Sequence, residues 1–199
     1  MKERIKKYFL ENKVWFSISL GTFLSGIVLG FVLVLVFPSV LEKLLDFLSS
    51  TFEEEIASLL SHNNLKTTAL IFLNNIKSSL VLSIGGLVFG FLTLFGLFFN
   101  GLILGIIGGA LVLSGEVVLL FLTLTPHGVF EIPAVLFAAS WGLRFGLEWM
   151  LDKHKGKRKA VFKANLKGFV SFLPVLILLL VIAAFIEVYI SGTLATKFG

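Results

Sequence analysis

The 199-residue sequence contains no cysteine, which excludes disulfide bonds, thiolate nucleophiles and cysteine-ligated metals. Charged residues are also scarce, at 15% of the chain, whereas about a quarter is usual in a soluble domain. Hydrophobic residues make up 57%, and the mean hydropathy is +1.00. These proportions exclude a water-soluble globular protein and predict a polytopic membrane protein.

Several uncharged stretches are long enough to cross a bilayer, which takes about 20 apolar residues. The first follows a basic start; a cleaved signal peptide is the alternative, but the stretch exceeds a signal peptide's apolar region and lacks a small-residue cleavage site. Residues 78–115 are uncharged and too many for one crossing, so we expect a turn at Asn100-Gly101, two residue types typical of tight turns. The sequence therefore predicts a single all-α membrane domain with about five transmembrane helices, at residues 14–37, 69–99, 102–124, 126–151 and 168–190.

Two segments outside these spans differ in charge. Residues 39–64 alternate acidic and apolar side chains at three-to-four spacing, which predicts an amphipathic helical hairpin. Residues 152–167 hold seven lysines and arginines against one aspartate, and such loops belong in the cytoplasm. A patch for nucleic acid or anionic lipid is the alternative for the basic segment. We expect a multi-pass protein of the cell membrane with a cytoplasmic amino terminus, an external acidic hairpin and no nucleic-acid partner.

Small residues recur at intervals of four in the predicted third and fourth spans. In lipid, helices associate by close backbone contact, which small residues permit. The residues predicted to pack helices together are Gly101, Gly105, Gly109, Ala134, Ala138, Gly142 and Gly146. The small-residue face of the fourth span could contact this chain or a second copy, so a homodimer is one expectation.

Polar side chains within the predicted spans are few, and a charged one costs roughly 2.5–3.5 kcal/mol at the bilayer centre. Arg144 and Glu148, one helical turn apart near the cytoplasmic end of the fourth span, can pair with each other or extend their charged ends to the membrane surface. The other polar residues fall on the outer side of the predicted topology. They form a predicted polar cluster of Asn74, Asn75, Lys77, Glu116, His127, Glu131 and Glu187.

His127 and Glu131 belong to the unusual stretch PHGVFEIPA at residues 126–134. A helix could begin at Pro126, or at Pro133 with residues 126–132 forming an irregular loop. The two side chains could be metal ligands, part of an ion pathway, or members of a buried hydrogen-bond network. Catalytic zinc usually takes three protein ligands, and the sequence shows no catalytic triad, phosphate loop or paired carboxylates. We therefore expect no enzymatic activity, no metal and no cofactor.

Three sequence elements occur together in order. They are FLNNI at residues 72–76, Asn100-Gly101 with the following Gly105, and PHGVFEIPA at residues 126–134. With the basic start and the acidic segment, they resemble the stage II sporulation protein M family over roughly residues 6–190.

In endospore formers, the resemblance implies a membrane anchor that holds cell-wall-degrading partners at a septum without hydrolysing anything itself. Similar proteins also occur where no spores form. We therefore expect a non-enzymatic membrane scaffold in envelope or membrane remodelling, whose partners are the lipid bilayer and other membrane or envelope proteins. The alternative is a small transporter or channel component that uses the outer polar cluster.

Overall fold

The computed structural model describes residues 2–38, 64–151 and 156–191. Its helices are α1 (Lys2–Val36), α3 (Asn64–Gly85), α4 (Phe91–Leu113), α5 (Val117–Leu147) and α6 (Arg158–Ile186). A 3-10 turn, η1 (Glu148–Met150), continues α5, and a π-helical turn, η3 (Glu187–Ser191), continues α6. Within the described residues, five helical segments are long and apolar enough to cross a membrane. The predicted all-α, five-span fold is therefore confirmed, while the predicted acidic hairpin lies outside the described residues except for Asn64, which begins α3.

The predicted turn at Asn100-Gly101 is wrong. Both residues lie inside α4, where the Asn100 side-chain amide donates a hydrogen bond to the Gly96 carbonyl oxygen at 2.8 Å. The chain turns instead at residues 86–90, where Phe89 and Gly90 have φ of 50° and 72°. The second and third spans are thus residues 64–85 and 91–113, rather than 69–99 and 102–124.

Two other predicted boundaries also move. α5 begins at Val117 and remains helical through Pro126 and Pro133, so residues 126–132 are helix rather than an irregular loop. Prolines are tolerated inside membrane helices because neighbouring helices and local adjustments satisfy the freed backbone groups. α6 begins at Arg158, inside the segment predicted as a basic loop at residues 152–167. Lysine and arginine are good helix formers, so their charge marks a side of the membrane and not the absence of a helix.

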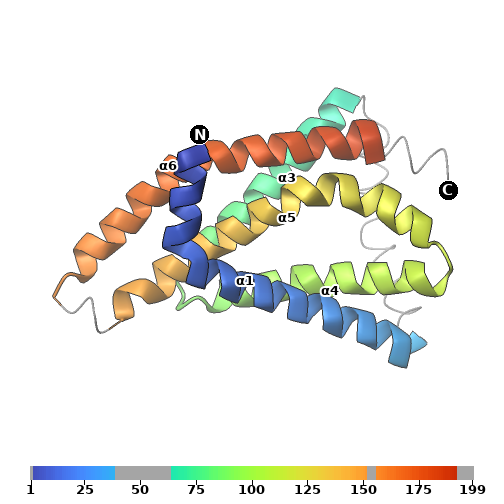
Figure 1. Cartoon of the computed structure of the whole chain (residues 1–199), viewed down its shortest axis with the longest axis horizontal. Helices are drawn as coiled ribbons and strands as arrows, with labels where there is room; N and C mark the ends of the chain where they lie inside the picture. The colour runs from blue at the N-terminus through green and yellow to red at the C-terminus, as the bar shows by residue number, and fades with distance from the viewer. Residues whose placement is uncertain (1, 39–63, 152–155, 192–199) are drawn as a thin grey trace.

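Helices α1 and α4 lie side by side and run in the same direction (Figure 1). Gly26 and Gly30 of α1 lie against the backbone of α4 at Phe98–Leu102 and Leu102–Ile106, while Gly101 and Gly105 of α4 lie against the backbone of α1 at Phe23 and Ile27. A Cβ atom on any of these four glycines would overlap the backbone of the neighbouring helix. The two backbones therefore touch, which explains why glycines occupy these positions.

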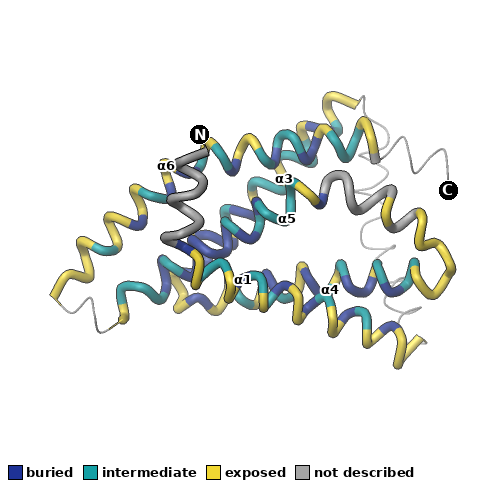
Figure 2. The backbone as a smooth tube through the Cα atoms, viewed as in Figure 1, coloured by how far each residue is buried: buried dark blue, intermediate teal, exposed yellow. Residues whose placement is uncertain are grey.

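Helix α5 is the central helix of the bundle. In an apolar 18-residue stretch of α5, 56% of the residues are buried, against 28–33% in the corresponding stretches of the other four spans. Figure 2 shows the buried residues concentrated in α5. Its small-residue face contacts this chain: Gly142 lies against Leu82 and Thr93, Gly146 lies against Gly86, and Ala134 and Ala138 belong to the core shared with α6. This face is covered within one chain, so it does not supply a surface for a second copy.

The bundle has two distinct ends (Figure 1). The 86–90 turn, the end of α5 and the beginning of α6 lie at one end, which we call the basic end because exposed side chains gather at the start of α6: Lys157, Arg158, Lys159, Lys163 and Lys167. The 114–116 turn and the end of α1 lie at the opposite end, which we call the far end.

Candidate functional site

The seven residues of the predicted polar cluster occupy different parts of the bundle. Asn74, Asn75 and Lys77 lie near the middle of α3, not near its outer end, because α3 begins and ends earlier than predicted. Glu116 is exposed in the turn between α4 and α5, and Glu187 is half-buried in η3. The remaining two residues belong to α5: the backbone of His127 is helical while its side chain lies outside the described set, and Glu131 is half-buried.

Glu131 lines a half-open cavity of about 220 Å³ between α1, α4 and α5. Asn100 of α4 contributes the other long polar side chain, and Gly128 leaves room because it has no side chain. The remaining lining is apolar and consists of Phe23, Ile103, Leu104, Ile107, Ile132 and Val135. A mostly apolar cavity with one carboxylate and one amide is suited to a small amphipathic group.

An apolar layer lies between this cavity and the basic end. Phe23, Leu97, Leu136 and Ala139 form it, with exposed fractions of 5%, 0%, 4% and 0%. Leu82 of α3 joins the same cluster, so α1, α3 and α4 all pack against α5 at this level. These described side chains pack together beneath the cavity. Buried hydroxyl groups follow on the side of the basic end, where Ser83, Thr93 and Ser140 each donate a hydrogen bond to a backbone carbonyl oxygen.

A buried polar network lies nearer the basic end. The Arg144 Nε donates to a Glu148 carboxylate oxygen at 2.5 Å, as the one-turn spacing predicted. Arg144 Nη1 also donates to Asn12 Oδ1 at 3.0 Å, and Asn165 Nδ2 donates to the same Glu148 oxygen at 3.0 Å. The network thus joins α1, the end of α5 and α6.

Asn12 and Asn165 are members of this network that the sequence did not predict. Each lies beside basic residues, where an amide is unremarkable, and the two are far apart in the chain. Their helical spacing from apolar neighbours could have indicated that they face the bundle, but this spacing does not identify a hydrogen-bond partner. Burial is the distinguishing property, since their exposed fractions are 1% and 3%.

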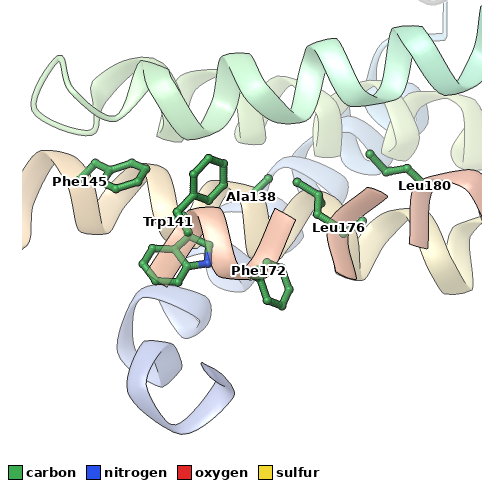
Figure 3. Packing of buried hydrophobic residues seen from close by; sticks show 8 residues of the cluster. Ala138, Trp141, Phe145, Phe172, Leu176 and Leu180 are labelled. Atoms are coloured by element: carbon green, nitrogen blue, oxygen red, sulfur yellow. The ribbon is translucent and has the colours of Figure 1, made fainter. Parts of the chain in front are cut away.

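Aromatic side chains surround the network on the α5–α6 side. The Arg144 guanidinium lies 5.1 Å from the centre of the Trp141 ring, a cation–π distance. Trp141 in turn packs with Phe145 and Phe169, and Phe172 belongs to the same cluster. The Cβ that Gly168 lacks would overlap the Trp141 ring. Figure 3 shows this cluster along the contact between α5 and α6. The surrounding rings exclude water and so strengthen the ion pair.

Within the described part of the chain, no group of three or more His, Cys, Asp or Glu side chains is placed to hold a metal ion. The His127 side chain lies outside the described set, so the described residues do not test the metal interpretation. The cavity that Glu131 lines bears on the ion-pathway and hydrogen-bond interpretations.

Comparisons with known proteins give a family and two relatives. The sequence model of the family described as stage II sporulation protein M matches residues 19–192. An uncharacterised protein from Methanocaldococcus jannaschii is 38% identical over 130 residues, which cover 63% of this chain and 71% of that protein. A second uncharacterised protein from the same organism is 28% identical over 203 residues, covering 99% of this chain and 88% of that protein. No solved structure matches.

Proposed function

This chain belongs to the stage II sporulation protein M family, and from that premise we propose that it is a non-enzymatic membrane scaffold that anchors partner proteins in envelope or membrane remodelling. A scaffold requires a fixed shape in the bilayer and surfaces for other proteins. It requires no water-filled path across the membrane.

The observation that carries this proposal is the apolar layer of Phe23, Leu97, Leu136 and Ala139. These side chains are almost fully buried and separate the cavity at Glu131 from the polar network at Arg144. An ion that crossed this layer would lose its hydration among apolar side chains. The interlocked glycines of α1 and α4 support the proposal as well, because they hold two spans at backbone contact.

The proposed orientation follows from charge. Lysines and arginines concentrate on the cytoplasmic side of membrane proteins, and the exposed basic residues of α6 gather at one end of this bundle. We place that end in the cytoplasm, and the amino terminus with it, in the cell membrane.

Isolation of the full chain from its own host tests the scaffold proposal. The tagged protein, expressed at its native level and extracted with its surrounding lipid, is expected to retain membrane or envelope proteins in fixed ratio. An unrelated five-span protein with the same tag, treated identically, should not retain them. Isolation of the chain alone after mild cross-linking would contradict the proposal.

A small transporter or channel component is the second candidate, and the cavity with Glu131 and Asn100 is the observation in its favour. Vesicles that contain the purified chain and a pH-sensitive dye test it directly. The scaffold proposal expects proton flux no greater than in protein-free vesicles. Flux that exceeds this background, and that Glu131→Gln abolishes, would replace the scaffold with the transporter.

A further inference from the structure

One face of α3 is polar in the middle of the helix and faces away from the bundle. Asn74, Lys77 and Ser78 are all exposed there, although α3 is one of the five apolar spans. Their spacing of three and four residues places them on one side of the helix. Apolar exposed residues continue the same face on both sides, at Leu73 and at Val81.

The opposite face of α3 fixes the helix against the rest of the bundle. Phe72, Ile76 and Leu80 pack against the core formed by α5 and α6. The Ser83 hydroxyl donates a hydrogen bond to the Ala138 carbonyl oxygen of α5 at 3.0 Å. Rotation of α3 to bury Lys77 would break these contacts, so the polar face stays directed outward.

Lys77 lies well inside the apolar span formed by α3. At about 1.5 Å per residue it lies roughly 20 Å from the beginning of α3 and roughly 12 Å from its end. The turn that follows exposes Leu87, Val88 and Phe89, so the apolar surface continues beyond the end of the helix. In a hydrocarbon layer of about 30 Å, Lys77 is too far from either interface for its stem to reach water comfortably.

Lys77 has no carboxylate partner within the described part of the chain, because none of the hydrogen bonds or ion pairs there involves it. An unpaired ammonium at this depth is costly, and such residues pair with another group or line a wet cavity. Lys77 is not among the residues that line the cavity at Glu131. A partner outside the described bundle is therefore required.

We propose that the face formed by Asn74, Lys77 and Ser78 binds a transmembrane helix of a partner protein that carries an aspartate or glutamate near the bilayer centre. The inference rests on the proposed scaffold function and names the docking surface that a scaffold needs. The partner carboxylate neutralises Lys77, and Asn74 and Ser78 supply hydrogen-bonding groups beside it.

Charge and depth favour this occupant over two others. A second copy that bound through the same face by two-fold symmetry would bring one Lys77 near the other, and like charges repel. An anionic lipid headgroup lies at the membrane surface and does not reach the depth of Lys77. A helix with a mid-bilayer carboxylate meets both requirements.

A designed transmembrane peptide tests the proposal with the full chain in phosphatidylcholine vesicles. The probe is an uncharged Leu-Ala helix with one central glutamate, and its matched control carries glutamine at that position. Energy transfer from the peptide to a dye on Glu116→Cys measures binding, because the chain has no other cysteine. We expect the glutamate peptide to bind roughly three- to tenfold more tightly than the glutamine peptide.

Variants of the full chain identify the face that binds. Lys77→Met should abolish the preference for glutamate, Lys77→Arg should retain it, and Lys163→Met, which changes an exposed lysine at the basic end, should leave it unchanged. The Lys77 side chain is exposed, so these variants are expected to fold with an unaltered melting temperature. Equal binding of both peptides, or a preference that survives in Lys77→Met, would overturn the proposal.

Disulfide cross-linking gives an independent measurement. A peptide with a cysteine one turn from its glutamate should cross-link to Ser78→Cys and not to Val28→Cys, an exposed control position within α1. Cross-linking of two chains through Ser78→Cys in preference to the peptide would identify a second copy as the occupant and overturn the proposal.

Failure of this inference is distinguishable from failure of the scaffold. If native partners still co-purify with Lys77→Met and the peptide does not bind, the docking face is wrong and the scaffold stands. If the peptide binds and native partners are absent, the face is correct and the scaffold proposal fails.

Discussion

At the scale of single residues, Arg144 is a largely buried charge that contacts several groups at once. Its side chain is 15% exposed, and it bonds Glu148 and Asn12 while lying over the Trp141 ring. A guanidinium suits this position because its several N–H groups point in fixed directions to different partners. The residue thus holds α1 and α5 together at the basic end, and Glu148 extends the connection to Asn165 of α6.

Replacement of Arg144 by methionine is expected to lower the free energy of unfolding by about 3 kcal/mol, because Glu148 then loses its buried partner. Unfolding in detergent, followed by tryptophan fluorescence, measures the change. Lys163→Met is the control, since that side chain is exposed and should change stability little. Adding Glu148→Leu to Arg144→Met should restore part of the loss, because it removes the orphaned charge. A single variant as stable as the wild type would contradict this account of the network.

At the scale of helices, contact in this protein depends on backbone approach more than on large side chains. Gly26 and Gly30 of α1 face Gly101 and Gly105 of α4, and no side chain separates the two backbones at these points. The α3–α4 turn uses the same device against α5, where Gly86 lies against Gly142. Because lipid tails are as apolar as leucine, such close van der Waals contact is what favours helix association over lipid solvation.

The two glycines of α1 at positions 21 and 26 provide a matched test. Gly26→Ala places a methyl group against the backbone of α4 and is expected to cost about 1–3 kcal/mol of stability. Gly21 has open space around it, so Gly21→Ala should be neutral or stabilise by up to about 1 kcal/mol through helix propensity. Thermal unfolding in detergent compares the two variants, and equal melting temperatures would show that the α1–α4 contact is not close-packed.

A second matched pair lies in α5. An added methyl group at Gly142 would meet the Leu82 carbonyl oxygen and the Thr93 hydroxyl, which are themselves joined by a 2.6 Å hydrogen bond. Gly142→Ala should therefore destabilise the protein by about 1–3 kcal/mol, whereas Gly128→Ala makes only an ordinary contact with Ile132. Protease sensitivity at the 86–90 turn, in addition to melting temperature, reports whether that turn has been displaced from α5. Similar behaviour of both variants would exclude this role for the small-residue face.

At the scale of the whole molecule, five spans place the two ends of the bundle on opposite sides of the membrane. α1 and α4 run parallel, as an alternating order of spans with α3 between them requires. The exposed lysines and arginines at the start of α6 occupy one end, and Glu116 occupies the other. This asymmetry is the physical basis for the proposed cytoplasmic position of the basic end.

Single cysteines test that orientation without interference, because the natural chain has none. We expect Glu116→Cys to react with a membrane-impermeant maleimide in intact cells, and Lys157→Cys to react only after the membrane is permeabilised. Both positions are exposed, so a difference in labelling reports sidedness and not burial. The reverse pattern would invert the proposed orientation and place the amino terminus outside.

The sequence by itself determined that this protein is helical, crosses the membrane five times and has one strongly basic end. Those properties depend on local hydropathy, segment length and charge, which are summed over neighbouring residues. The same local view placed a turn at Asn100-Gly101, because it had no means to distinguish a glycine in a turn from a glycine at a helix contact. The structure shows that Gly101 is a contact glycine, because the backbone of α1 at Phe23 lies directly against it.

Tertiary structure alone decided which polar residues meet. Asn12, Arg144 and Asn165 come from three helices, and their hydrogen bonds exist because packing brings distant segments together. It also separated residues that the sequence grouped: Glu131 lines a cavity, whereas Lys77 faces outward from α3. The physical reason is that depth along a span follows from residue number, while direction around a helix depends on which neighbours pack against it.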